Sequence, residues 1–192
     1  MRSGLKTKVT VPIISLVIVC LAVSSVGIFR SSRTALQKTV NQQLMGIADA
    51  TGQLMDNWLN GTFMNVQMWA NDFHVKSYLA DPEKNAALRE RLNARLKEIS
   101  GDFPEFELIN VVNTRGEVVA SSDPSVIGKY SVTDRDYFQE SIQGRPMLSN
   151  AMQSKSTGEP VFVVSAPVRD GSDICGVIFG AVRLFAFSKK FI

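Results

Sequence analysis

The residues with the clearest chemical potential are the five at 134–138, Asp-Arg-Asp-Tyr-Phe, which place one guanidinium group between two carboxylates. The planar guanidinium of an arginine can hold a carboxylate through two charge-assisted hydrogen bonds. Arg135 can therefore bind an acidic ligand, or it can pair with an acidic residue near it, namely Asp134, Asp136 or Glu140. The residues alone favour the ion pair.

Composition excludes several classes of function. The chain has 192 residues and a net charge of +3, which is too small to indicate nucleic-acid binding. A single histidine, His74, leaves no pattern for a histidine metal site or a Ser/His/Asp triad, and no G-x-S-x-G motif or phosphate loop occurs. Two cysteines, Cys20 and Cys175, cannot form a disulfide-rich scaffold. We therefore predict a protein that is not an enzyme and has no cofactor, metal or nucleic-acid partner.

An uncharged segment near the start, residues 9–29, lies between Lys8 and Arg30. A helix of about 20 apolar residues crosses the hydrocarbon core of a bilayer. A cleaved signal peptide is the alternative, but its apolar part usually has about 7–15 residues, and the cleavage signal here is poor. We predict a cytoplasmic segment at 1–8, a transmembrane helix at 9–29, and an extracytoplasmic remainder anchored in the plasma (inner) membrane.

Residues 30–80 are expected to form one long helix. Apolar residues recur at heptad-like spacing, and a second apolar series continues them. The first series is Val40, Leu44, Ile47, Thr51, Leu54 and Trp58, and the second is Met55, Leu59, Phe63, Val66, Trp69 and Phe73. The helix can cover a domain with one face, and its first half can also pair with a second copy of the chain as a homodimer.

Residues 81–192 predict an α+β module. Asp81 and Pro82 are typical of a helix start, and that helix should end at 100–101. The hydrophobic period then changes to that of strands, with one short helix at 134–143. The expected strands are 107–112, 117–121, 146–150, 160–169 and 174–185. Short connections predict a PAS-like five-stranded antiparallel sheet, with the long helix on one face and the short helix and loops on the other.

Several short motifs in this module occur in the order found in one known family. They are residues 113–122, 127–128, 134–138, 157–161, 166–168 and 176–178. Residues 108–184 resemble the membrane-distal module of a double Cache domain, the extracellular sensor of bacterial chemoreceptors, histidine kinases and diguanylate cyclases. The chain is then expected to be a fragment that stops before the membrane-proximal module.

The resemblance also implies a ligand site. In the amino-acid-sensing branch, a tyrosine, an arginine and two aromatic residues hold the ligand carboxylate; the matching residues here are Tyr130, Arg135, Tyr137 and Phe138. Where that branch has a tyrosine and an aspartate before T-G, Met152 and Ser154 are nearest. Where its last aspartate binds the ligand ammonium, this chain has Ala181.

Because an unpaired buried charge is very costly, the missing acids predict a small carboxylate ligand without a required α-ammonium. Arg183 shares strand parity with Ala181, so it faces either the pocket or solvent, and Asn110 and Ser122 are weaker polar candidates. The resemblance favours a chemoreceptor sensor that signals across the membrane. The alternatives are the sensor of a histidine kinase or diguanylate cyclase, and a membrane-anchored assembly protein that acts through its long helix.

Overall fold

The computed structural model describes the backbone of residues 5–80 and 85–191, and the side chains of 21, 24–25, 40–80 and 85–189. The chain divides into two compact units, Met1–Gln53 and Leu54–Ile192. The first unit is part of one helix, whereas the second holds the rest of that helix and the sheet. The candidate site lies wholly in the second unit.

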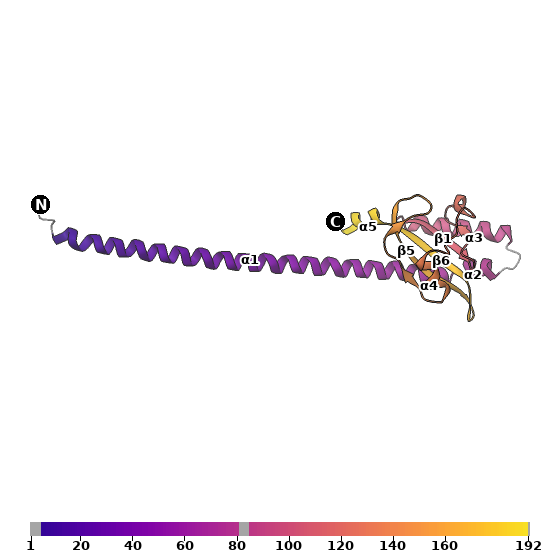
Figure 1. Ribbon diagram of the computed structural model, residues 1–192, viewed down its shortest axis with the longest axis horizontal. Coiled ribbons are helices and arrows are strands. Elements are labelled where there is room, and N and C mark those ends of the chain that lie inside the picture. Colours follow the sequence, from indigo (N-terminus) through magenta and orange to yellow (C-terminus); the bar gives the residue numbers. More distant parts are fainter. Residues whose placement is uncertain (1–4, 81–84, 192) are drawn as a thin grey trace. The chain divides into compact units, whose positions relative to one another are not determined.

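Figure 1 labels the elements along the chain. The helices are α1 (Leu5–Ala70), α2 (Phe73–Ala80), α3 (Ala86–Asp102), the 3-10 turn η1 (Pro124–Val126), α4 (Asp136–Ile142) and α5 (Leu184–Phe191). The strands are β1 (Phe106–Asn113), β2 (Val118–Ser121), β3 (Met147–Leu148), β4 (Met152–Gln153), β5 (Pro160–Asp170) and β6 (Asp173–Arg183). Most predicted strands therefore agree with the structure to within a few residues at each end.

The prediction of one helix over 30–80 is wrong at its end, because α1 stops at Ala70 and α2 starts at Phe73. Asp72 causes the restart: its Oδ1 accepts a hydrogen bond from the His74 backbone nitrogen at 2.8 Å, which caps α2. Asn71 donates from its side chain to the Gln67 carbonyl at 3.1 Å. Short polar side chains that bond to the nearby backbone offer it an alternative to the helix.

Within the described part of the chain, no helix combines the length and hydropathy of a membrane span. The side chains of most residues in the predicted segment 9–29 lie outside that part. The predicted helix start at Asp81 and Pro82 also falls outside the described residues. The start of α3 is instead capped by Asn85, whose side chain accepts from the Ala87 nitrogen at 2.8 Å.

The sheet is antiparallel throughout, with the strand order β2-β1-β6-β5-β3 and with β4 also paired to β5. It has six strands rather than the predicted five, because the two-residue strand β4 pairs Met152 with Val161. A strand this short carries no alternation by which the sequence could show it. Its place beside β5 brings Met152 and its neighbours over one face of the sheet.

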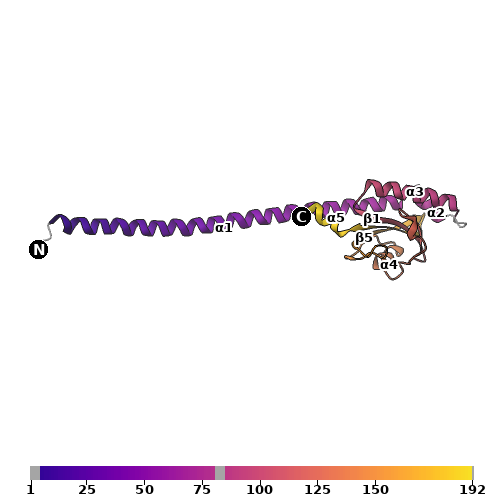
Figure 2. The same cartoon turned by 90° about the horizontal axis from the view of Figure 1, so that it is seen from above.

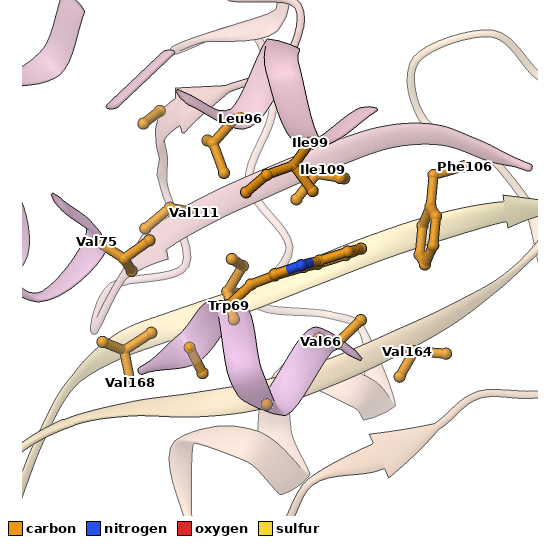
Figure 3. Packing of buried hydrophobic residues seen from close by; sticks show 14 of the residues in the cluster. Val66, Trp69, Val75, Leu96, Ile99, Phe106, Ile109, Val111, Val164 and Val168 are labelled. Carbon is orange, nitrogen blue, oxygen red and sulfur yellow. The ribbon is translucent and has the colours of Figure 1, made fainter. Parts of the chain in front are cut away.

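Side chains of the sheet alternate between two cores, as the predicted layers require. On β6, Ile178 and Val182 pack toward α1, α2 and α3, whereas Phe179 and Ala181 pack on the opposite face. Trp69, 3% exposed, lies among the residues of the first core (Figure 3), with its ring centroid 5.2 Å from that of Phe106. Figure 2 shows α2 and α3 on one side of the strands and α4 on the other. The face toward α4 holds the candidate site.

Candidate functional site

A small cavity lies between the sheet and the segments that carry α4 and β4. Six of the seven predicted site residues line it: Tyr130, Arg135, Tyr137, Met152, Ser154 and Ala181. Phe138 is the exception, because it is buried in the core on the same face and is not among the lining residues. The structure therefore brings together residues that are up to 51 positions apart, from Tyr130 to Ala181.

Strand alternation explains which sheet residues reach the cavity. The apolar wall comes from alternate positions of three neighbouring strands, Leu108 on β1, Val161 and Val163 on β5, and Phe179 and Ala181 on β6. The same parity on β1 adds a polar residue, Asn110. The sequence could have identified these residues by extending the alternation from Ala181 to the adjacent strands.

The opposite wall comes from two loops and the first turn of α4. Arg135 is the residue just before α4, in an extended conformation (φ −100°, ψ 132°), and its nitrogen donates to the Val132 carbonyl at 3.0 Å. This placement directs the side chains of Arg135 and Tyr137 to one side. Gln153, Ser154 and Lys155, at and after β4, complete the lining, and sequence reasoning did not find Gln153 and Lys155.

Arg135 has no close carboxylate partner among the described residues. Its Nε lies 3.9 Å from Asp134 Oδ2, at the limit of an ion pair, and its Nη1 is 3.5 Å from the Met152 sulfur. Asp134 is instead bound by Lys155, whose Nζ lies 2.5 Å from Oδ1, and this contact holds the pKa of Asp134 below its usual range. Glu140 forms an ion pair with Arg145, whose Nε lies 2.6 Å from Glu140 Oε2. The guanidinium of Arg135 therefore lines the cavity without a close acidic partner among the described residues.

The two tyrosines are hydrogen-bond donors on this wall. Burial raises the pKa of Tyr137 and of Tyr130, so both hydroxyl groups keep their protons at neutral pH. The Tyr130 hydroxyl accepts a hydrogen bond from Asn110 Nδ2 at 3.4 Å, which leaves its own hydrogen to donate elsewhere. Arg135 and the tyrosines together favour an anionic group in the cavity.

Two buried acceptor atoms lie on β1, on the other side of the site. Asn110 Oδ1 and Glu107 Oε2 have no hydrogen-bond partner within the described residues. The other carboxylate oxygen of Glu107 accepts from the hydroxyls of Ser154 at 2.6 Å and Thr157 at 3.0 Å, but Glu107 does not line the cavity. Sequence reasoning missed Glu107, because the irregularity in register between Phe106 and Leu108 interrupts the alternation there.

The remaining candidates lie elsewhere. The Nη1 atom of Arg183 donates to the carbonyls of Pro104 at 3.0 Å and Phe106 at 3.1 Å, so this arginine holds the linker before β1 and does not line the cavity. Ser122 Oγ accepts from the Ile109 nitrogen at 3.0 Å. Cys175 is a half-buried free thiol that donates to the Val168 carbonyl at 3.3 Å, and burial raises its pKa.

The cavity is small, about 20 Å³, which is room for one water molecule. A ligand of several atoms therefore requires the loops over it to move outward. Polar contacts hold the segment after β4 in place: Glu107 accepts from Ser154 and Thr157, and Lys155 contacts Asp134 and the Ser131 carbonyl, the latter at 2.7 Å. The described residues contain no group of three or more His, Cys, Asp or Glu side chains that could hold a metal ion. The lining offers the Arg135 guanidinium, the Lys155 ammonium and two tyrosine hydroxyls as hydrogen-bond donors.

An antiparallel sheet with the end of α1, α2 and α3 on one face and a small lined cavity on the other defines an α+β module. A family model described as a Cache domain, of the dCache_1 type, matches residues 32–191. The chain therefore belongs to the Cache family of ligand-binding sensor domains. A comparison with curated protein sequences found no match.

Solved structures share this fold. The sensor domain of the Vibrio cholerae histidine kinase DctB matches with a TM-score of 0.70 and 20% identity, over 80% of this chain and 60% of that one. The sensory domain of the Campylobacter jejuni chemoreceptor Tlp3, with isoleucine bound, matches with a TM-score of 0.69 and 13% identity, over 81% and 64%. The ligand-binding domain of the Pseudomonas aeruginosa amino-acid chemoreceptor PctC, in complex with GABA, matches with a TM-score of 0.60 and 17% identity, over 77% of this chain and 65% of that one. This chain thus spans under two thirds of these domains.

Proposed function

We propose that this chain is the sensor part of a membrane receptor that binds a small carboxylate through Arg135. The observation that carries the proposal is the arginine itself: it lines a cavity, its side chain is 23% exposed, and the nearest acid is occupied by Lys155. A guanidinium in this setting gains two charge-assisted hydrogen bonds when a carboxylate enters. Tyr130 and Tyr137 add donors to the same anionic group.

The ligand signal would leave the domain through the sheet. Ala181 and Phe179 face the cavity, while Ile178 and Val182 on the same strand pack against the core that contains the end of α1. A ligand that pushes the cavity open would therefore shift β6 relative to α1. Binding energy that differs between the two arrangements is what would shift their populations.

Membrane anchorage and dimerisation are part of the proposal. Segment 9–29 would cross the plasma membrane, with the sensor outside the cytoplasm. The proposed dimer seam is exposed in this single chain, as pairing with a second copy requires. The exposed fractions are 43% for Val40, 59% for Leu44, 64% for Ile47 and 60% for Leu54. Trp58 leaves this seam, because its ring packs against Phe162 and Phe187. Reporter fusions after residues 35 and 150 test the topology, and activity of a cytoplasm-only reporter at either position would contradict it.

Among receptors, we favour a chemoreceptor, with the sensor of a histidine kinase or diguanylate cyclase as the alternative. The structures with the same fold include both chemoreceptors and kinases, so the output must be identified in cells. The other class is an assembly protein that acts through α1. That class predicts self-association that no small molecule changes.

A thermal-shift screen of the full chain against small carboxylates and amino acids tests the ligand proposal. We expect at least one carboxylate to raise the melting temperature, and Arg135→Gln to abolish that rise. Arg145→Gln is the matched control, since Arg145 is an exposed arginine paired with Glu140 outside the cavity. A shift that survives Arg135→Gln, or no shift with any acid, would contradict the proposed function.

A further inference from the structure

Asn110 is a lining residue whose hydrogen bonding is incomplete. Its side chain is 1% exposed, and its Oδ1 atom has no donor within the part of the chain that the structure describes. Its Nδ2 atom already donates to Tyr130. A buried acceptor without a donor is costly, so this atom needs a partner that enters the cavity from outside.

We infer that Asn110 determines ligand specificity by accepting a hydrogen bond from an uncharged donor on the ligand. The ligand class is then a hydroxycarboxylate, with the hydroxyl on the carbon beside the carboxylate. The inference rests on the proposed function, because Arg135 must hold the carboxylate. The cavity of about 20 Å³ places both residues at one small space, so the donor and the carboxylate must be close neighbours in the ligand.

Charge around the cavity favours a hydroxyl over an ammonium group. Arg135 and Lys155 both line the cavity, and its described lining contains no carboxylate. The buried carboxylate of β1, that of Glu107, does not line the cavity and accepts hydrogen bonds from the hydroxyls of Ser154 and Thr157. An ammonium would therefore lose its water shell beside the Arg135 guanidinium, and the lining offers it no carboxylate as a counter-charge.

The orientation of the amide also disfavours a second carboxylate on the ligand. With Nδ2 directed to Tyr130, the carbonyl oxygen of Asn110 is the group that lacks a partner, and an oxygen anion beside it would be repelled. The Tyr130 hydroxyl and the Arg135 guanidinium remain as donors for a single carboxylate. The site thus offers donors to one end of the ligand and an acceptor to its neighbouring group.

Calorimetry on the full chain with four acids tests this specificity: propanoate, 2-hydroxypropanoate, alanine and succinate. We expect 2-hydroxypropanoate to bind about tenfold more tightly than propanoate, the typical worth of one hydrogen bond to a buried group. Asn110→Leu, of nearly the same size, should remove this preference, so that 2-hydroxypropanoate and propanoate bind with equal affinity. Asn110→Asp keeps the acceptor and adds a charge, so it should improve the affinity for alanine relative to the parent chain.

Asn93→Leu is the control, because Asn93 belongs to α3, lies outside the cavity and accepts from the Ser121 nitrogen at 2.9 Å. Its preference for the hydroxyacid should equal that of the parent chain. The inference is overturned by equal affinities of the hydroxyacid and propanoate, which would mean that a water molecule satisfies Asn110, and by a failure of all four acids to bind. If alanine binds more tightly than 2-hydroxypropanoate, Glu107 balances the charge of the alanine ammonium. If succinate binds more tightly, the Asn110 amide has the opposite orientation and donates to the second carboxylate. Either result also overturns the inference.

The proposed function fails separately. If Arg135→Gln leaves the affinities for these acids unchanged, then the carboxylate is not held by Arg135, whatever Asn110 does. If Arg135→Gln abolishes binding while Asn110→Leu keeps the hydroxyl preference, the proposed function stands and only the specificity inference is lost.

Discussion

At the residue scale, Lys155 determines whether Arg135 has an acidic partner in the chain, because it binds Asp134, the acid nearest to Arg135. Lys155 lies 21 positions beyond Asp134 in the sequence, yet it binds that carboxylate at 2.5 Å. Asp134 is 64% exposed, so its remaining attraction for Arg135 at 3.9 Å is weak and screened by water. The guanidinium is thus held near the cavity without being neutralised.

Replacing Asp134 should strengthen carboxylate binding. Asp134→Asn removes a negative charge beside Arg135 and releases the Lys155 ammonium next to the cavity. Exposed charge pairs are worth about 0.2–1 kcal/mol, so we expect affinity to rise by up to about fivefold in calorimetry. Asp173→Asn, an exposed change on the β5–β6 hairpin, should have no effect. Weaker binding after Asp134→Asn would show that the Asp134–Lys155 contact is needed to form the site.

Tyr137 should make stability sensitive to alkaline pH. Burial raises its pKa in the folded chain, so folding favours the protonated hydroxyl. In the unfolded chain the tyrosine loses its proton near pH 10. The contribution is therefore complete below about pH 10 and is lost as the pH rises through the folded value. Denaturant titrations from pH 8 to 11 should show a steeper loss of unfolding free energy for the parent than for Tyr137→Phe. Parallel curves would argue against a buried, protonated hydroxyl.

The candidate site shows what a sequence can and cannot specify. The Cache resemblance was sufficient to select Tyr130, Arg135 and Ala181, which meet at one cavity. The partners of those residues could not be predicted in the same way. Glu107 faces Ser154 only because β1 is irregular there, and Phe138 packs into the core although it is one residue from Tyr137. Such outcomes depend on packing between distant segments.

At the element scale, hydrophobic period identified the helices and the long strands, and it failed where local polar chemistry intervenes. Asp72 divides the predicted helix by accepting a hydrogen bond from the His74 backbone nitrogen. The two-residue strand β4 forms through its antiparallel pairing with β5. Both events involve too few residues to produce a period. The two cores, by contrast, follow from alternation over the 11 residues of each of β5 and β6.

Close packing between α2 and the sheet makes Gly176 a sensitive position. A methyl group there would fall on the Val112 carbonyl oxygen, and it would lie 2.8 Å from Leu79 Cδ1. Because the backbone of β1 cannot yield cheaply, Gly176→Ala should lower the free energy of unfolding by about 1–3 kcal/mol. Gly61→Ala in α1 has open space around it and should raise that free energy by about 0.5–1 kcal/mol. Chemical denaturation measures both, and equal effects would refute the packing at β6.

At the scale of the whole molecule, α1 links the predicted membrane segment to the sensor unit. Among the described side chains of α1, the exposed apolar residues Val40, Leu44, Ile47 and Leu54 lie before Trp58, which packs against the core of the second unit. A heptad-like seam of this length is marginal alone, and anchorage in a membrane would raise its effective concentration.

Cysteine scanning tests this pairing. In full chains lacking Cys20 and Cys175 and inserted in membranes, single cysteines at 40, 44, 47, 51 and 54 should crosslink between copies. Positions 43 and 48, between these apolar residues, serve as controls and should crosslink less. A flat profile along 40–54 would mean that α1 serves only its own chain.

The crystal structure of the full chain with the carboxylate that stabilises it most would test the central claim directly. We expect both carboxylate oxygens to lie about 2.7–2.9 Å from the guanidinium nitrogens of Arg135, with the segment after β4 moved outward to enlarge the cavity. The account would be contradicted if the ligand occupied the outer groove beside Arg89 and Lys129, a space of about 580 Å³, while Arg135 kept its present contacts.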